Sequence, residues 1–378
     1  MRTRTIKEGG AKLVVPAQPR THDVFFNPEM ELCRDVTSLA VGAFQERARR
    51  KLAVCDALAG TGARGVRYAA ENPGIARVDF VDLNPIACGL IRRNAALNKL
   101  HPWKVYCTDF RIFASEGRGY DWLELDPFGS PAPYLHDGMF LLRDRSAISV
   151  TATDTAVLCG ARAAACLKNY RAVPVNNECC HETGVRILLA TIAAHAAEFN
   201  CGIIPLFSLS RAHYFKTVVE IGQGAEAAGQ SMAELGWALF CPACGHRFII
   251  KGLAVPLPAS CEECGTKLKI AGPLWVGPLW DRRFVKSMAA LNEKRDYGQK
   301  KAIEKLLTTI YGEAALGPLF FDVHRLCSQL KATPPRLDDL VAGLRKKGFK
   351  AARTHFRENS IRTNARAADL AKLIRLRS

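Results

Sequence analysis

Short apolar runs recur along the first two-thirds of the chain, separated by stretches in which apolar positions repeat with a helical period. The runs have the length of buried strands, and the longer amphipathic stretches are typical of helices. Strands that alternate with helices predict βαβ units and a largely parallel sheet. The last two runs follow each other directly and are expected to form an antiparallel pair that closes the sheet. The predicted strands span residues 11–16, 52–57, 77–81, 104–108, 120–126, 146–151, 203–208 and 214–221.

The predicted strand 120–126 ends in a carboxylate, Asp126, and the next residue is Pro127. Proline has no backbone N–H and cannot continue the hydrogen-bond ladder of a central strand, so the strand stops there. In open α/β sheets, ligands bind beyond the carboxyl ends of the strands. Asp126 is therefore a candidate catalytic residue on a loop stiffened by Pro127 and Pro131. Because Asp before Pro is also common in turns, the loop alone leaves a purely structural role open.

A glycine-rich loop, Gly60–Gly65 (GTGARG), follows the predicted strand 52–57 and precedes a predicted helix. Such a unit opens a nucleotide-binding βαβ fold, because glycines let the backbone approach a ligand closely. The next strand ends at Asp82, 22 residues after Gly60, where an acid can accept both ribose hydroxyls of an adenosine. A glycine loop followed by an acid at this distance occurs both in dinucleotide-dependent dehydrogenases and in S-adenosylmethionine-dependent methyltransferases. The loop lacks the usual helix context of the dinucleotide fingerprint, and Arg64 is placed near a cofactor carboxylate, which favours the methyltransferase.

Aspartates end several successive predicted strands. Asp109 follows strand 104–108, and in a methyltransferase an acid at this position reaches the adenine amino group. Because neighbouring parallel strands present their carboxyl ends at one edge of the sheet, these side chains are expected to surround one nucleotide-sized cleft. The aspartates at or near strand ends are Asp56, Asp82, Asp109 and Asp126.

Two CxxC pairs follow residue 240, with sixteen residues between them. Each pair is followed by a glycine, Gly245 or Gly265, which permits a tight turn around a metal. This spacing is typical of a zinc ribbon, in which four thiolates form a closed tetrahedral site with a structural role. Iron is the main alternative metal, and His246 would be a fifth ligand and is not included. The predicted ligands are Cys241, Cys244, Cys261 and Cys264.

The chain has 378 residues and 14 cysteines, which are mostly scattered. Its first ten residues lack the apolar core of a secretory signal, so we expect free thiols and metal ligands rather than disulfides. The adjacent Cys179, Cys180 and His181 are not expected to bind a metal, because neighbouring residues on a helix point in different directions. No run of eighteen apolar residues occurs, so we expect a cytoplasmic chain without a membrane span.

Positive charge is concentrated towards the C-terminus. The formal net charge is +17, and residues 281–378 hold 22 Lys and Arg against 10 Asp and Glu. A basic segment of this size favours a nucleic acid partner, with a solvated basic surface as the alternative. A small-residue stretch at 222–229 is interpreted as a linker. It divides the chain into a methyltransferase domain, 1–225, and a C-terminal RNA-binding domain, 226–378, which contains the ribbon at 237–270 and the basic part at 281–378.

The basic part is predicted to be helical at 279–311 and then to form two helices, 320–330 and 336–347. A hairpin over 349–355 and 360–364 follows. Helix, turn, helix and hairpin indicate a winged-helix-like module, and a generic basic helical cap is the alternative. The residues expected to follow RNA phosphates are Lys346, Lys347, Lys350 and Arg353.

Several of these segments resemble the tRNA (guanine-26 N2,N2)-dimethyltransferase family, over residues 25–364. They are Asn27-Pro28 with Arg34-Asp35, Ala59–Gly65, the loop Asp126–Pro131 (DPFGSP), Thr151–Asp154 (TATD) and Arg353–Phe356 (RTHF). The DPFGSP loop is the most specific. The resemblance implies a Rossmann-like class I methyltransferase domain with a C-terminal α+β domain, S-adenosyl-L-methionine as methyl donor and tRNA as partner. The cofactor contacts that it implies are Arg34, Gly60, Arg64, Asp82, Asp109 and Phe110, the last beside the adenine.

The substrate atom in this family is the exocyclic N2 of a guanine, a poor nucleophile because its lone pair is delocalised into the ring. A carboxylate that accepts an N2 hydrogen can remove the proton as the new bond forms. We assign that role to Asp126, with the Pro127 carbonyl orienting the amine and Phe128 stacking on the base. Two alternatives are an inactive zinc-containing RNA-binding protein and an N6-adenine or protein amine methyltransferase.

Overall fold

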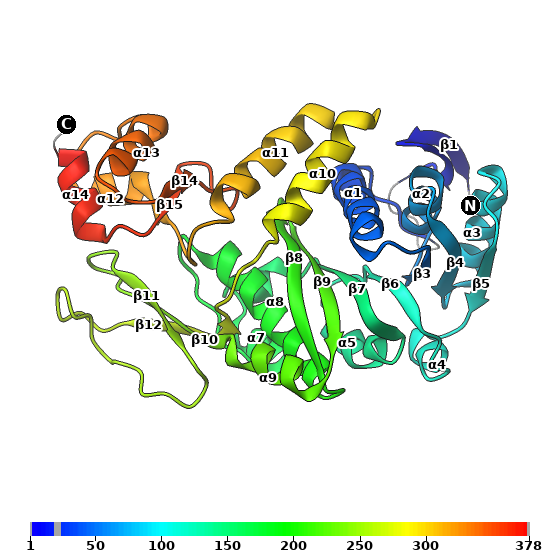
Figure 1. The fold of residues 1–378 in the computed structure, drawn as a ribbon, viewed down its shortest axis with the longest axis horizontal. Coiled ribbons are helices and arrows are strands. Elements are labelled where there is room, and N and C mark those ends of the chain that lie inside the picture. The colour runs from blue at the N-terminus through cyan, green and yellow to red at the C-terminus, as the bar shows by residue number, and fades with distance from the viewer. Residues whose placement is uncertain (1, 19–23, 376–378) are drawn as a thin grey trace.

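The structure is a computed structural model that describes residues 2–18 and 24–375 (Figure 1). At its centre is a seven-stranded sheet in the order β5-β4-β3-β6-β7-β9-β8. The first five of these strands pair in parallel, and β9 is antiparallel to both β7 and β8. The predicted α/β class and the antiparallel closing pair are therefore confirmed. The strands are β3 Leu52–Ala57, β4 Ile75–Asp82, β5 Trp103–Cys107, β6 Tyr120–Leu125, β7 Leu142–Ala152, β8 Cys201–Arg211 and β9 Tyr214–Gln223.

Helices cover both faces of this sheet (Figure 1). Helices α1, α2 and α3 pack side by side on one face, and α4, α5 and α8 pack on the other. Every residue of β3 and β6 is buried as a result, which explains why these strands are mostly apolar. The acids Asp56, Asp121 and Glu124 in them are buried as well. An N-terminal hairpin, β1 and β2, packs against α2 and α3. The bounds are β1 Thr3–Glu8, β2 Ala11–Pro16, α1 Glu31–Ala48, α2 Ala63–Glu71, α3 Pro85–Leu97, α4 Phe110–Ala114, α5 Ala132–Met139, α6 Thr155–Leu158, α7 Ala163–Tyr170 and α8 Cys180–Ala197, with a 3-10 turn at Pro28–Met30.

The stretch predicted as a linker is structured instead, so that interpretation is wrong. Helix α9, Ala225–Ala233, begins directly after Gly224 and packs on β8. A β-carbon on Gly202 of β8 would lie only 2.2 Å from the Ala227 carbonyl oxygen. The small residues therefore allow close packing of the helix on the sheet.

A three-stranded antiparallel sheet follows, in the order β11-β10-β12. Its strands are β10 Leu235–Phe240, β11 Arg247–Lys251 and β12 Lys269–Trp275. After it, the stretch predicted to be helical, 279–311, forms two helices, α10 Arg282–Lys294 and α11 Lys300–Glu313, which pack against each other. Helix α10 also packs on α1, so this basic segment returns to the face of the large sheet (Figure 1).

The C-terminal residues form a small module with an apolar core of its own. The two predicted helices and the hairpin are present as α12 Val323–Leu330, α13 Leu337–Lys346, β14 Ala351–Arg353 and β15 Ser360–Thr363. Strand β13 Phe321–Asp322 adds a third strand beside β15, and helix α14 Ala367–Arg375 packs on α12 and α13. Within the described part of the chain, no helix has the length and apolar content needed to cross a bilayer.

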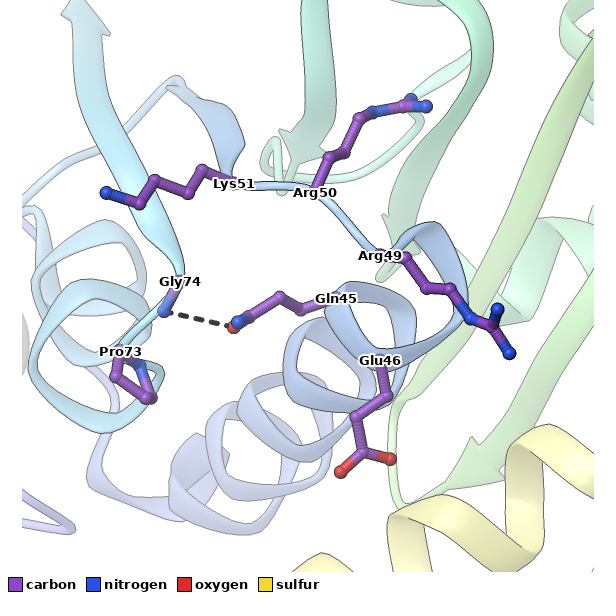
Figure 2. Close-up of a pocket in the computed structure, with 7 residues that line it drawn as sticks. All are labelled: Gln45, Glu46, Arg49, Arg50, Lys51, Pro73 and Gly74. Atoms are coloured by element: carbon purple, nitrogen blue, oxygen red, sulfur yellow. Dashed lines mark hydrogen bonds between the residues drawn. The ribbon is translucent and has the colours of Figure 1, made fainter.

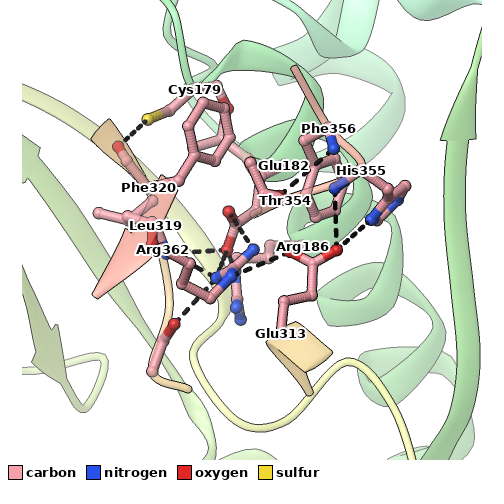
Figure 3. Close-up of polar contacts among 12 residues, drawn as sticks. Cys179, Glu182, Arg186, Glu313, Leu319, Phe320, Thr354, His355, Phe356 and Arg362 are labelled. Atoms are coloured by element: carbon pink, nitrogen blue, oxygen red, sulfur yellow. Dashed lines mark hydrogen bonds and ion pairs between the residues drawn. The ribbon is translucent and has the colours of Figure 1, made fainter. Parts of the chain in front are cut away.

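One apolar core extends from the large sheet into the segment after residue 226, through side chains such as Trp280 and Phe284. The Trp280 indole N–H donates to the Ser208 carbonyl oxygen at 2.8 Å. A buried ion-pair network also joins α8 to α11 and to the C-terminal module (Figure 3). We call it the Glu182 network; its members are Glu182, Arg186, Glu313, His355 and Arg362.

Candidate active site

The predicted acids lie on neighbouring strands, as the sequence predicted. Strands β5, β4, β3 and β6 are adjacent in the sheet, and their carboxyl ends lead to Asp109, Asp82, the glycine loop and Asp126, respectively. Asp56 differs from the other three, because it is buried and its Oδ2 accepts from the Gly65 N–H at 2.8 Å. Burial raises the pKa of Asp56 to about 8. Asp56 therefore stabilises the glycine loop through the Gly65 backbone and is assigned a structural role.

The glycine loop requires glycines in its backbone. Gly60 and Gly62 have φ of 56° and 71°, in the left-handed region that disfavours other residues. A β-carbon on Gly65 would lie 2.5 Å from the Phe80 ring. Asp82 fixes the start of the loop, since its Oδ2 accepts from the Gly60 N–H at 2.7 Å and its Oδ1 from the Asn84 N–H at 2.8 Å.

Asp109 and Phe110 begin the short helix α4. The Asp109 side chain caps this helix by accepting from the Arg111 N–H at 2.8 Å. The Phe110 ring is buried and lies edge-on to Tyr134, with ring centroids 6.1 Å apart.

Arg34 is buried on α1. Its Nε and Nη2 each donate to Glu8 at 2.6 Å, its Nη1 donates to the Asn27 carbonyl oxygen at 3.1 Å, and it lies over the Phe26 ring. Burial opposes ionisation of Glu8, but Arg34 and Arg67 outweigh it and lower its pKa. Arg34 thus ties the N-terminal hairpin to the segment before α1.

Asp126 is paired with Arg64, the arginine of the glycine loop. The Arg64 Nε donates to Asp126 Oδ2 at 2.7 Å, and its Nη2 donates to the Cys33 sulfur at 3.4 Å. The Arg64 Nη1 is buried and has no hydrogen-bond partner among the described residues. The Asp126 side chain keeps 27% of its surface exposed, so the pair lies at the boundary between the core and the surface.

Beneath this pair lies a second, fully buried pair that the sequence analysis missed. The Lys216 ammonium on β9 donates to Glu124 on β6, and also to the Thr151 hydroxyl at 2.9 Å. Glu124 also accepts from the Tyr68 hydroxyl at 2.9 Å. Burial opposes ionisation of Asp126, but the charges of Arg64 and Lys216 outweigh it and hold its pKa below the ordinary value.

The DPFGSP loop is fixed by the TATD segment at the end of β7. The Gly129 N–H donates to the Thr153 hydroxyl at 2.8 Å, and the Thr153 N–H donates to the Gly129 carbonyl oxygen at 3.0 Å. Ser130 and Asp154 are joined through the Tyr170 hydroxyl, with both hydrogen bonds at 2.8 Å. These contacts explain why two segments far apart in sequence belong to one site.

Phe128 projects from this loop and is 77% exposed, whereas Pro127 is buried. The Phe128 ring meets Phe25 edge-on, with centroids 5.1 Å apart. Phe25, which was not singled out from the sequence, also lies close to the glycine loop, because its carbonyl oxygen is 3.8 Å from the position of a Gly60 β-carbon. An exposed aromatic pair therefore stands beside the carboxylate.

The four predicted metal ligands converge. The sulfur atoms of Cys241 and Cys264 are 3.4 Å apart, those of Cys244 and Cys261 are 3.7 Å apart, and all four lie within 4.8 Å of one another. A tetrahedral zinc ion with Zn–S bonds of ~2.3 Å separates its sulfurs by about 3.8 Å, so the cluster can hold Zn²⁺. Gly245 and Gly265 both adopt positive φ, 73° and 72°. Each donates its N–H to the carbonyl oxygen of the first cysteine of its pair.

The four predicted RNA contacts lie together in the C-terminal module. Lys346 and Lys347 end α13, Lys350 precedes β14, and all three are exposed. Arg353 on β14 is also exposed, but its guanidinium pairs with Asp338 through two hydrogen bonds of 2.9 and 2.8 Å. The three lysines are therefore better placed to meet phosphates than Arg353.

A shallow pocket lies at the opposite edge of the large sheet (Figure 2). It is lined by the end of α1, including Gln45 and Arg49, and by Gly74 before β4. The Gly74 N–H donates to Gln45 Oε1 at 3.2 Å. Because it is at the amino ends of β3 and β4, this pocket is separate from the acids described above.

Comparison with known proteins identifies the family. A family model described as N2,N2-dimethylguanosine tRNA methyltransferase matches residues 4–375. The tRNA (guanine(26)-N(2))-dimethyltransferase of Methanobrevibacter smithii is 36% identical over 98% of this chain and 97% of its own length. The protein of the same name from Thermococcus kodakarensis is 34% identical, with 98% of each chain covered.

Among solved structures, that of Trm1 from Pyrococcus horikoshii with S-adenosyl-L-methionine superposes with a TM-score of 0.87. It is 33% identical in sequence, and the match covers 98% of this chain and 99% of that one. The resemblance inferred from the glycine loop, the DPFGSP loop and the TATD segment is confirmed over the full length: the chain belongs to the N2,N2-dimethylguanosine tRNA methyltransferase family.

Proposed function

We propose that this chain transfers methyl groups from S-adenosyl-L-methionine to N2 of guanine 26 in tRNA, giving N2-methylguanosine and then N2,N2-dimethylguanosine. The observation that carries the proposal is the ion pair of Asp126 with Arg64. It places a carboxylate that can accept a proton beside a guanidinium whose Nη1 has no partner among the described residues. The family relationship supplies the substrate class.

The residues present fit S-adenosyl-L-methionine. The unpartnered, buried Nη1 of Arg64 is suited to the carboxylate of the cofactor, since an orphaned guanidinium nitrogen is costly without an acceptor. Asp82 would accept the ribose hydroxyls and Asp109 the adenine amino group, with Phe110 beside the adenine and the Gly60 backbone at the loop. Arg34 completes this set, and Glu8 holds its guanidinium in place. When bound, the cofactor supplies an electrophilic methyl group on a sulfonium.

Asp126 accepts a hydrogen of the guanine amino group. Its lowered pKa keeps it ionised at neutral pH, so it can take up the proton that N2 loses when the methyl group is transferred. The proton then leaves to solvent, and the monomethylated amine still carries one N–H for a second cycle. The Pro127 carbonyl orients the amine, and Phe128, backed by Phe25, stacks on a base drawn out of the RNA.

Glu124 and Lys216 act on this chemistry through Arg64 and Asp126. Lys216 lies on β9, next to the strand that carries Thr151, and it adds a positive charge beneath the catalytic carboxylate. Glu124 balances that charge, so that the two buried pairs are neutral together. We propose them as positioning residues.

The test of the proposed function is nucleoside mass spectrometry of tRNA after reaction with the pure chain and S-adenosyl-L-methionine. N2-methylguanosine and N2,N2-dimethylguanosine are expected. Methylated adenosine, or no modified nucleoside although the cofactor binds, would contradict the proposal and favour one of the two alternatives.

Asp82→Ala should weaken S-adenosyl-L-methionine binding by about 10- to 100-fold, because hydrogen bonds to a charged group contribute ~1.5–3 kcal/mol. The measurement is calorimetric titration with the cofactor. Asp82→Asn, which keeps an acceptor for the Gly60 N–H, separates loss of the ribose contact from loosening of the loop. Equal affinity in Asp82→Ala and the unaltered chain would remove Asp82 from the cofactor site.

We propose that the methyltransferase part, 1–225, binds the cofactor and the base, and that the part from 226 to 378 binds tRNA, with a structural Zn²⁺ in the ribbon. If so, affinity for tRNA should fall steeply with salt, and each lost phosphate contact should lower the slope of log K against log salt by about 0.7–0.9. Lys347→Ala should lower this slope, whereas Arg353→Ala should lower it less, because the Arg353 guanidinium already pairs with Asp338. Lys51→Ala, at the opposite edge of the sheet, is the control, and a slope unchanged by Lys347→Ala would exclude that contact.

A further inference from the structure

A second group of metal-binding side chains lies outside the ribbon, between helices α6 and α8. Cys159 directly follows α6, and Cys180 and His181 are the first two residues of α8. One ligand atom from each lies within 4.8 Å of the other two, and all three side chains are partly exposed. Cys159 and Cys180 are both free thiols.

The sequence alone argued against a metal here, because side chains of adjacent helical residues diverge by about 100°. The structure supplies the missing element, since Cys159 comes from a different helix and lies within reach of both neighbours. The side chains of Cys180 and His181 diverge, but the Cys159 sulfur lies near the ligand atoms of both, so one metal ion could contact all three. The expectation of no metal site at Cys180 and His181 therefore rested on too short a segment.

The two elements that carry these ligands are locked together. Gly160, directly after Cys159, has φ of 87°, and a β-carbon on it would lie 2.9 Å from the backbone of Val175 and Asn176. A β-carbon on Gly184 of α8 would lie 3.2 Å from the Leu158 β-carbon. The Gly184 contact joins α8 to the end of α6 directly, and Val175 and Asn176 lie in the segment that leads into α8. The three ligands are therefore held near one another without a metal, which lowers the ordering cost of binding one.

We propose that Cys159, Cys180 and His181 bind a second Zn²⁺, with its fourth coordination position left to solvent. Two thiolates and an imidazole are a donor set that selects zinc among the common divalent ions, and three protein ligands leave the open geometry seen in non-structural zinc sites. The site is close to the catalytic edge, because the His181 ring is 6.2 Å from that of Phe215, which pairs with Ala152 at the end of β7.

The experiment is elemental analysis of the full chain, produced with zinc and dialysed against metal-free buffer without chelator. Two zinc ions per chain are expected for the unaltered protein, one for Cys180→Ser and two for Cys166→Ser. Cys166 is a matched control, a buried cysteine on α7 that belongs to none of the metal-ligand groups among the described residues. Cobalt substitution adds a second readout, since the sulfur-to-cobalt absorption should fall in Cys180→Ser and be retained in Cys166→Ser. One zinc per chain in the unaltered protein, unaffected by Cys180→Ser, would overturn the proposal.

A measurement without any variant covers the case in which Cys180→Ser does not fold. Alkylation of the zinc-loaded chain, read by mass spectrometry, should spare Cys159 and Cys180 until a chelator is added. Alkylation of both at the same rate with and without zinc, or a disulfide between them in the freshly purified chain, would overturn the second site.

Discussion

Asp126→Asn should retain S-adenosyl-L-methionine binding and lose methyl transfer to tRNA by about 10²–10⁴-fold in kcat/KM, the range that a positioned general base contributes. The amide oxygen of asparagine can still accept the Arg64 Nε–H, so the cofactor side of the pair is preserved. What is lost is the ability to take up the N2 proton. Transfer from labelled cofactor to tRNA measures the loss, and calorimetry with the cofactor alone shows whether the site is intact.

The control for this substitution is Asp144→Asn. Asp144 lies near the start of β7, at the edge of the sheet opposite to the catalytic end, and accepts from the Gln223 N–H. It should retain full activity. Equal methyl transfer by Asp126→Asn and Asp144→Asn would remove the proposed role of Asp126 while leaving the family assignment intact.

The lowered pKa of Asp126 also fixes the sign of a pH dependence. Because its folded pKa lies below the ordinary aspartate value of 3.8, the carboxylate is already ionised at neutral pH. Activity that depends on this ionised form is therefore complete near pH 7 and is lost only as the pH falls into the acid range. An activity rise centred near neutral pH would point to another titrating group.

Much of this site could be predicted from the sequence because its parts are local. A strand that ends in Asp126-Pro127, a glycine loop followed by Asp82, and two CxxC pairs each depend on residues close together in the chain. In a parallel sheet the ends of neighbouring strands meet at one edge, so local motifs were enough to predict that these acids converge. The structure confirms that the strands leading to these acids are neighbours in the sheet.

The parts that could not be predicted depend on partners far apart in sequence. Glu124 and Lys216 are 92 residues apart and lie on β6 and β9, which β7 separates in the sheet, so nothing near either residue predicts their pairing. Nothing near Arg34 in the sequence predicts its pairing with Glu8, which lies 26 residues away. The Gly222–Gly229 stretch was wrongly interpreted as a linker because small residues serve both flexible chains and close packing, and only the contact with Gly202 distinguishes the two.

The Glu182 network shows the same limit on a larger scale, since Glu182 and Arg362 are 180 residues apart (Figure 3). The Arg362 guanidinium donates to both Glu182 oxygens, at 3.0 and 2.8 Å, and to Glu313 at 3.1 Å. Glu182 also accepts from Arg186, and Glu313 from His355 at 2.5 Å. Burial opposes ionisation of Glu182, but Arg362 and Arg186 outweigh it and lower its pKa to about 2. The network thereby fastens β15 of the C-terminal module to α8 of the large sheet.

Arg362→Met should lower the free energy of unfolding by about 3–5 kcal/mol, because it keeps the volume of the side chain but leaves two buried carboxylates short of a partner. Chemical denaturation followed by circular dichroism measures this loss. Arg366→Met removes an exposed arginine four residues away, near Glu263, and should cost less than about 1 kcal/mol. A cost for Arg362→Met no larger than that for Arg366→Met would mean that the buried charges do not hold the module, and that apolar packing alone does.

The same network predicts a pH dependence of stability. Since the folded pKa of Glu182 is about 2 and its ordinary value is 4.5, the stability that it contributes is complete above pH 4.5 and is lost as the pH falls towards 2. Arg362→Met should lose stability less steeply in that window, because the pKa of Glu182 rises towards its ordinary value.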